Sequence, residues 1–241
     1  MNELIRVVYQ QGLSEVAYYS FHVLSYILIG VFYIWYGQKL GIKVWKMLLT
    51  VLVWFPLAYL WTCILCWIEN GFRDFGSNNI VRLFIYVPLF GIPIAKLLKI
   101  EWSRACDFLT FAPLISQAVG HCGCLFVGCC QGYPNNWGLY HPTRFQILFP
   151  VQVFEIITAT AIIVVLLIWA KKRDYVPDKR QYPIMMIMFG MTRFVWEFFR
   201  NNEKIWLGCS ALAFHALFMA MVGGVTLLVM RKRDRVAEQN A

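Results

Sequence analysis

Three charged side chains interrupt an apolar stretch of this chain, Phe189–Arg200. Arg193, Glu197 and Arg200 have the spacing that places all three on one face of a helix. Such a face is costly in lipid, so it must contact protein or a polar cavity. One interpretation is an Arg193–Glu197 ion pair, with Arg200 reaching toward the membrane interface. We favour a clamp for an anionic group, because guanidinium groups bind phosphate oxygens in a bidentate way.

A second candidate segment combines glycines with thiols. Its four glycines lie close together in the chain: Gly120, Gly123, Gly128 and Gly132. Glycine destabilises helix interiors, so we expect a loop rather than a regular helix. Because the segment is apolar, we expect this loop to lie at membrane depth and to bind an anion through its backbone N–H groups. A tight surface turn is the less favoured interpretation.

Thiols and an imidazole in the same segment raise the question of a metal site. His121 lies among Cys122, Cys124, Cys129 and Cys130. The spacing differs from the usual Cys-x2-Cys pairs, so we expect no metal ion and no other cofactor. A reactive thiol at Cys129 or Cys130 is an alternative. The other cysteines are expected to be plain buried residues: Cys63, Cys66, Cys106 and Cys209.

A third polar element opens a later apolar stretch, Phe149–Glu155. Proline suits the first turn of a helix, which would place Gln152 and Glu155 on about the same face inside the membrane. Glu155 would then counter one of the arginines or contact a ligand. Arg82, at the start of an earlier apolar stretch, is either a further anion contact or an interface residue.

Long apolar stretches must position these side chains. The chain is 60% hydrophobic and 15% charged, and its mean hydropathy is +0.58, which is typical of a membrane protein. About seven stretches approach the length that crosses a bilayer. They are 18–36, 45–67, 80–98, 107–119, 150–170, 183–200 and 207–230, of which 107–119 is short for a span. The predicted fold class is all-α, a polytopic membrane protein with one transmembrane domain, 1–241.

The basic residues predict the topology. Of the 22 Lys and Arg residues, fifteen follow the first, third, fifth and seventh stretches. The positive-inside rule therefore places the N-terminus outside and the C-terminus, 231–241, in the cytoplasm. The net charge of +9 is thus a topology feature, and we expect no nucleic-acid partner. Residues 1–17 lack the pattern of a cleaved signal and predict an amphipathic segment on the outer surface.

The order of these motifs resembles the phosphatidylglycerol–prolipoprotein diacylglyceryl transferase family. The resemblance covers about residues 78–229 and includes Asp107-Phe-x-x-Phe-Ala-Pro. It rests on Gly-x-x-Gly-x-x-x-x-Gly-x-x-x-Gly from Gly120, then Pro-x-Gln-x-aromatic-Glu ending at Glu155. The third and most specific motif is Gly-x-x-Arg-Phe-x-x-Glu-Phe-Phe-Arg, ending at Arg200. The fold that the resemblance implies also has seven spans and an external N-terminus.

The resemblance implies a transferase of the bacterial cytoplasmic (inner) membrane. Its phospholipid donor would be phosphatidylglycerol, and its acceptor a cysteine thiol in a precursor protein that carries a lipobox. Arginines would stabilise the departing phosphate, and His121 is our candidate for the base that deprotonates the thiol. We assign catalysis to His121, Arg193 and Glu197. We assign substrate contacts to Arg200, Arg82, Gln152, Glu155, Gly123, Cys124, Gly128, Cys129, Cys130 and Gly132.

The sequence also departs from the family pattern and resembles a divergent, cysteine-containing branch. His121 stands where the family has Arg, Cys124 where it has Asn, and Cys129 where it has Glu. The family's His-Gly-Gly has no counterpart at Ile80–Leu83, and Phe189 replaces a tyrosine. Two other functions therefore stay open. One is a membrane thiol oxidoreductase that uses Cys124, Cys129 and Cys130, and the other is a phospholipid-binding relative without catalysis.

Overall fold

Helices make up most of the structure, a computed structural model that describes residues 1–69, 71–73 and 93–239. They are α1 (Asn2–Gln10), α2 (Ser14–Lys39), α3 (Val44–Glu69), α5 (Trp102–Leu109), α6 (Phe111–Val127), α7 (Val151–Lys172), α8 (Gln181–Glu197) and α9 (Ala211–Gln239). Two strands, β1 (Pro134–His141) and β2 (Gln146–Leu148), form an antiparallel hairpin in which Tyr140 faces Ile147.

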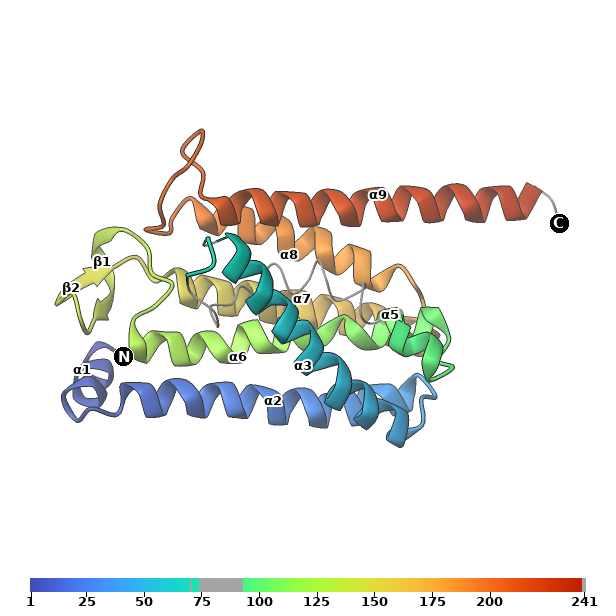
Figure 1. Ribbon diagram of the computed structural model, residues 1–241, viewed down its shortest axis with the longest axis horizontal. Helices are drawn as coiled ribbons and strands as arrows, with labels where there is room; N and C mark the ends of the chain where they lie inside the picture. The colour runs from blue at the N-terminus through green and yellow to red at the C-terminus, as the bar shows by residue number, and fades with distance from the viewer. Residues whose placement is uncertain (70, 74–92, 240–241) are drawn as a thin grey trace.

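The long helices lie side by side along one axis (Figure 1). In the described chain, α6 packs between α2 and α7, α8 packs between α7 and α9, and α3 packs on α2. Among the described residues, four segments are long and apolar enough to cross a membrane: Ser14–Lys39, Ser103–Val127, Val151–Lys172 and Ala211–Gln239. The helical fold class is therefore confirmed. The predicted number of seven spans stays a prediction, since most of the third stretch, 80–98, lies outside the described residues.

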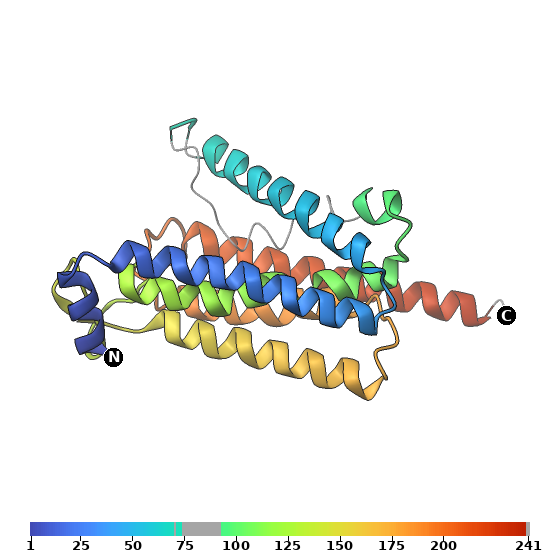
Figure 2. The same ribbon diagram turned by 90° about the horizontal axis from the view of Figure 1, so that it is seen from below.

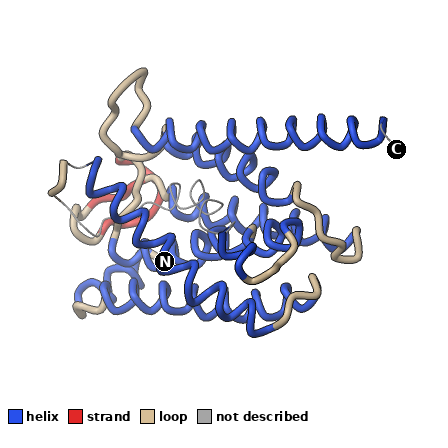
Figure 3. Tube along the Cα trace, turned by 45° about the vertical axis from the view of Figure 1, so that its right-hand side comes forward, coloured by secondary structure: helices blue, strands red, loops and turns tan. Residues whose placement is uncertain are grey.

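The two ends of the bundle differ in structure and in charge. The hairpin, the N-terminal helix and the loop between α8 and α9 gather at one end (Figure 3). The basic connections after α2, before α5 and after α7 lie at the other end, together with the basic end of α9 (Figure 1). The basic residues that the sequence assigns to one side of the membrane thus lie at one end of the bundle.

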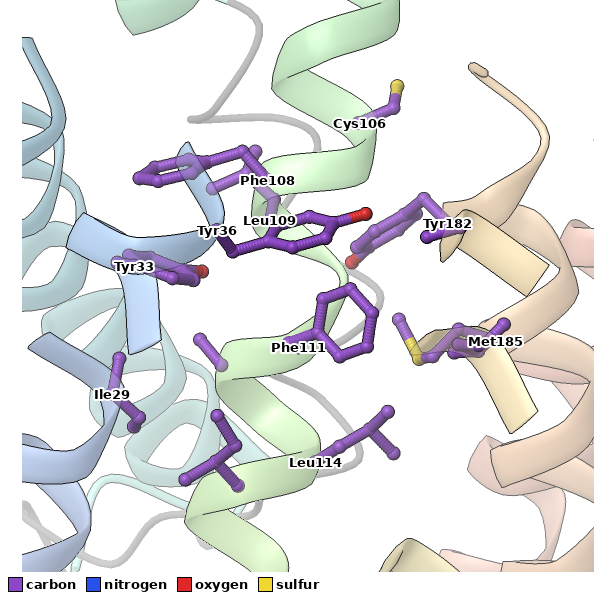
Figure 4. Packing of buried hydrophobic residues seen from close by; sticks show 14 of the residues in the cluster. Ile29, Tyr33, Tyr36, Cys106, Phe108, Leu109, Phe111, Leu114, Tyr182 and Met185 are labelled. Atoms are coloured by element: carbon purple, nitrogen blue, oxygen red, sulfur yellow. The ribbon is translucent and has the colours of Figure 1, made fainter. Parts of the chain in front are cut away.

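Aromatic side chains pack around α6 in the core. Phe111 of α6 lies between Tyr36 of α2 and Met185 of α8 (Figure 4). The Phe111 and Tyr36 ring centroids are 5.0 Å apart, and those of Tyr33 and Phe108 are 4.0 Å apart. All five side chains are buried. Because lipid tails are as apolar as these side chains, close packing of this kind holds membrane helices together.

The sequence predicts a loop over residues 120–132. This prediction is wrong for residues 120–127, which are helical. Gly120 and Gly123 lie inside α6, and the helix ends only at Gly128, which has a left-handed φ of 75°. A Cβ atom on Gly123 would lie 2.9 Å from the Tyr18 carbonyl oxygen of α2. The glycine thus lets the two helices approach, which offsets its cost inside a helix. The fourth span, predicted as short, consequently extends over Ser103–Val127.

The N-terminal helix crosses the end of the bundle. Figure 2 shows α1 running across the direction of α2. The Asn2 side chain accepts a hydrogen bond from the Tyr140 N–H of β1 at 3.0 Å, and Ile5 is fully buried. The Arg6 guanidinium lies 4.4 Å from the centroid of the Tyr140 ring. Residues 1–10 therefore form a helix docked on the hairpin, and its position at a membrane surface stays a prediction.

Candidate active site

The carboxylate of Glu155 binds two buried arginines. Glu155 lies in the second turn of α7, and its carboxylate accepts hydrogen bonds from Arg193 of α8 and from Arg200 just after α8. The Arg200 bond measures 2.5 Å, and all three side chains are at least 96% buried. Charge-assisted hydrogen bonds of this kind are the strong ones in proteins. Glu155 therefore holds two arginines in the interior of the bundle.

Glu197 supplies the second carboxylate of this cluster. Its Oε2 lies 3.2 Å from Nη2 of Arg193 and 3.8 Å from Nε of Arg200. Its Oε1 accepts hydrogen bonds from Asn202 and, at 3.0 Å, from Ser210. These two neutral partners belong to the loop between α8 and α9, so Glu197 ties that loop to the charged cluster.

Only two of the three charged residues predicted to share a helix face lie on a helix. Arg193 and Glu197 lie on α8 as expected, but α8 ends at Glu197, before Arg200. Arg200 instead pairs with Gly132 in an isolated antiparallel β-bridge, and this bridge aims its side chain at Glu155. The three charged side chains nevertheless share one buried cluster, because the turn after α8 keeps Arg200 on the same side.

The charges of the two arginines and the two glutamates balance, yet some N–H donors of the arginines have no hydrogen-bond partner among the described residues. Within the described residues, the Nε groups of Arg193 and Arg200 and the Oε2 acceptor of Glu197 are buried without a hydrogen-bond partner. A buried N–H donor without a partner is costly, and more so when it is charged. A simple ion pair leaves these donors unsatisfied, whereas an anionic ligand would accept from them.

His121 extends the cluster onto α6. Its Nδ1 lies 3.0 Å from Oε2 of Glu155, and its Nε2 lies 2.9 Å from the side-chain nitrogen of Gln117. Gln117, which also donates to Glu155 at 3.4 Å, is a site residue that the sequence analysis missed. With a proton on Nδ1, Nε2 keeps a lone pair that accepts from the Gln117 amide. Nδ1 lies beside the Glu155 carboxylate without a hydrogen bond to it, so Glu155 acts on the imidazole through its charge.

The thiols lie beside His121. Cys124 is in the last turn of α6, and Cys129 and Cys130 follow that helix directly. Hydrogen bonds with the Cys124 and Cys129 thiols hold the pKa of Cys130 well below its usual range. Cys130 also has a φ of 61°, in the left-handed region that non-glycine residues seldom adopt, as is common at functional sites. The thiols of Cys124 and Cys130 thus lie next to His121, at the edge of the cluster of charged side chains.

The loop after α6 is fastened to its neighbours through the backbone. The side chain of Gln152 donates to the Cys129 carbonyl at 2.6 Å, and the Gly132 N–H donates to the Phe149 carbonyl at 3.1 Å. A Cβ atom on Gly132 would lie 2.8 Å from the Phe199 carbonyl. Gln152, Gly128 and Gly132 therefore position the loop, and they add no charged group to the cluster.

The structure brings together most of the residues that the sequence singles out. His121, Cys124, Cys130, Glu155, Arg193, Glu197 and Arg200 form the cluster, with Cys129 and Gln152 at its edge. Gly123 faces α2 instead, and Arg82 lies outside the described residues. The four cysteines expected to be plain core residues are buried. Besides Gln117, the analysis missed Asn202 and Ser210, which lie in a polar loop without any distinctive spacing.

The comparisons with known proteins agree with the motifs. The family model of prolipoprotein diacylglyceryl transferase matches residues 48–230. Phosphatidylglycerol–prolipoprotein diacylglyceryl transferase 2 of Clostridium perfringens (strain 13 / Type A) is 26% identical over 170 residues, which is 67% of this chain and 65% of that protein. The matched region thus spans slightly less than two thirds of the relative's length. Because the family match covers the helices that carry His121, Glu155 and the arginines, the chain belongs to the prolipoprotein diacylglyceryl transferase family.

Proposed function

We propose that the chain is a membrane transferase that moves the diacylglyceryl group of phosphatidylglycerol to a cysteine thiol of a lipoprotein precursor. The name of the Clostridium perfringens relative includes this donor and this class of acceptor. The observation that carries the proposal is the convergence of Arg193, Arg200 and His121 on one buried carboxylate, Glu155. It supports an anion site and a proton acceptor side by side.

The arginines would bind the phosphodiester of the donor. Arg193 and Arg200 are both buried, and their Nε groups have no hydrogen-bond partner among the described residues. As the bond between the glyceryl carbon and the phosphate oxygen breaks, negative charge grows on the leaving glycerol phosphate. Fixed guanidinium groups stabilise such charge without reorganising. Glu155 and Glu197 hold the two groups in place before the substrate arrives.

His121 would take the proton of the acceptor thiol. The sulfur then attacks the glyceryl carbon, forms the thioether and releases glycerol phosphate, while the proton stays on Nε2 of His121. Glu155, 3.0 Å from Nδ1, stabilises the imidazolium that this transfer creates. The acceptor thiol would replace the Gln117 amide, which now lies 2.9 Å from Nε2.

The proposed location of this site is the outer face of a bacterial cytoplasmic membrane. The site lies at the ends of α6 and α8 that adjoin the hairpin, opposite the basic end of the bundle (Figure 1). The positive-inside rule assigns the basic end to the cytoplasm. In this arrangement a single domain has an external segment, 1–17, and a cytoplasmic tail, 231–241.

Mass spectrometry tests the proposal. The purified protein is incubated with phosphatidylglycerol and a cysteine peptide that carries a lipobox, and the peptide is weighed. We expect a diacylglyceryl adduct on the thiol and release of glycerol phosphate. Arg193→Ala and His121→Gln should each abolish the adduct. Arg144→Ala, which removes an exposed arginine near the hairpin, is the matched control and should retain it.

The same experiment addresses the two alternative functions. Bound phosphatidylglycerol without adduct or glycerol phosphate would contradict the transferase and favour a phospholipid-binding relative. A thiol oxidoreductase would instead cycle Cys124, Cys129 and Cys130 between thiols and a disulfide, and these three cysteines are thiols in the structure. Thiol alkylation before and after reduction, followed by mass measurement, detects such a cycle.

A further inference from the structure

The thiol cluster beside His121 has the composition of a metal site. The imidazole of His121 and the sulfur atoms of Cys124 and Cys130 offer ligand atoms that lie within 4.8 Å of one another. In a tetrahedral zinc site with the usual bond lengths, neighbouring ligand atoms are about 3.8 Å apart. Small side-chain rotations at the end of a helix and in a loop are enough to close this difference.

A fourth ligand is within reach. The Cys129 thiol is near enough to those of Cys124 and Cys130 to interact with both. One imidazole and three thiolates form a ligand set that Zn²⁺ commonly occupies in proteins. The spacing of these residues in the sequence differs from the usual Cys-x2-Cys pairs, which led us to expect no metal. In the structure, α6 places residues 121 and 124 one turn apart, and residue 130 follows the turn at Gly128 and lies close to both.

The surroundings fit a metal ion rather than a chance group of thiols. His121 and Cys124 are more than 90% buried. Glu155 lies 3.0 Å from Nδ1 of His121, and carboxylates commonly lie beside metal-binding imidazoles in this way. A metal ion on Nε2 would displace the Gln117 amide, which lies 2.9 Å from that nitrogen. The positive Arg200 side chain is close enough to Cys130 to interact with it electrostatically.

We propose that His121, Cys124 and Cys130, with Cys129 as the fourth ligand, bind a thiophilic divalent cation such as Zn²⁺. The cation would fasten the end of α6 to the loop before β1. Its binding has a consequence that rests on the proposed function: Nε2 of His121 cannot hold a metal ion and accept the proton of a thiol. A bound cation therefore blocks the proposed transfer, and the site acts as a metal-sensitive switch.

Cobalt titration tests the binding without any need for activity. The protein is purified with a non-thiol reductant and without metal, and Co²⁺ is added while the visible and near-ultraviolet spectra are recorded. We expect one Co²⁺ per chain, with the sulfur-to-cobalt absorption and the intense visible bands of tetrahedral coordination, and displacement of Co²⁺ by Zn²⁺. Cys130→Ser should bind at least tenfold more weakly, and Cys124→Ser/Cys130→Ser should lose the sulfur-to-cobalt band.

Cys122→Ser is the matched control, since Cys122 lies on the same helix but donates to the Ala118 carbonyl. It should bind Co²⁺ as the wild-type chain does. A wild-type chain that gives no stoichiometric sulfur-to-cobalt band overturns the site, even where a variant fails to fold. In the adduct assay, Zn²⁺ should stop the wild-type reaction and a chelator should restore it. Turnover that continues with the metal bound overturns the switch alone, and a chain inactive in every condition overturns the proposed function alone.

Discussion

Glu155 sets the arrangement of the site at the scale of single residues. Its two oxygens contact Arg193, Arg200, His121 and Gln117, which belong to three different parts of the chain. A carboxylate buried in this way is stable only while its positive partners are present. The same holds for the arginines, whose charge inside a bundle of apolar helices needs a counter-charge nearby. Glu155 therefore serves stability and function together.

The substitution Glu155→Gln should destabilise the folded chain. The amide keeps the shape of the carboxylate but leaves two buried guanidinium groups short of negative charge, which costs about 3–5 kcal/mol. Thermal unfolding in detergent, followed by circular dichroism, measures the loss. Glu15→Gln removes an exposed carboxylate at the start of α2 and is the control. Equal unfolding temperatures for the two variants would mean that Glu155 does not hold the cluster.

Arg193→Lys should lower turnover while leaving the fold intact. Lysine keeps the positive charge but loses the fork that reaches Glu155 and Glu197 together. By analogy with the removal of one donor to a developing anion, we expect a fall of roughly 10²-fold in kcat. Initial rates of adduct formation give the value, and Lys204→Arg serves as a control at the same end. An unchanged rate would remove Arg193 from the catalytic residues.

Site residues with a distinctive spacing in the sequence could be predicted, whereas residues that join the site through contacts between helices could not. Arg193 and Glu197 were found because charged side chains one turn apart in an apolar stretch are costly in lipid and therefore mark a buried polar site. Gln117 was missed because an amide within an apolar stretch carries no charge and no pattern of its own. Its role depends on the distance between α6 and α7, which no local spacing encodes. The bond of Arg200 to Glu155 likewise depends on packing of α7 against α8.

At the scale of helices, α6 positions both clusters. It packs between α2 and α7 and carries Gln117, His121 and Cys124 on consecutive turns. The interior glycines of α6 misled the sequence analysis, because glycine's intrinsic cost predicts a loop. That cost is offset by contact with α2, a contribution that belongs to two helices and is invisible in either alone. The apolar helices α2, α7 and α9 were predicted close to their observed positions, because apolar length is a property of each segment by itself.

Close contact at Gly123 leads to a prediction for the α2–α6 interface. Gly123→Ala adds a Cβ atom 2.9 Å from the Tyr18 carbonyl oxygen, so the helices must separate or shift, at a cost of about 1–3 kcal/mol. Gly30→Ala is the matched control. A Cβ atom there meets nothing within 4 Å, and alanine favours the helix by up to about 1 kcal/mol.

Thermal unfolding of the two alanine variants in the same detergent separates the effects. The unfolding temperature should fall for Gly123→Ala and stay level or rise for Gly30→Ala. Because α6 also carries His121, the first variant should lose adduct formation along with stability. A Gly123→Ala chain as stable as the wild type would mean that the two helices tolerate a wider separation than the structure has.

At the scale of the whole molecule, the basic connections and the candidate active site lie at opposite ends of the helical bundle. The hairpin, α1 and the loop after α8 surround the end that holds Glu155, while the basic connections lie at the other end (Figures 1 and 3). An acceptor that has crossed the membrane and a donor lipid in the outer leaflet would both meet the site at the first end. This arrangement makes orientation in the membrane a direct test of the proposed reaction.

Fusion reporters determine that orientation. Alkaline phosphatase, active only outside the cytoplasm, is inserted into the turn between β1 and β2 after Thr143, and green fluorescent protein, which fluoresces only when folded inside, is fused to the C-terminus. The positive-inside rule predicts an active phosphatase and a fluorescent C-terminus. The reciprocal pair, with the reporters exchanged, should show neither activity. An active phosphatase at the C-terminus would invert the bundle and place Glu155 on the cytoplasmic side, where a thiol acceptor that has crossed the membrane could not reach it.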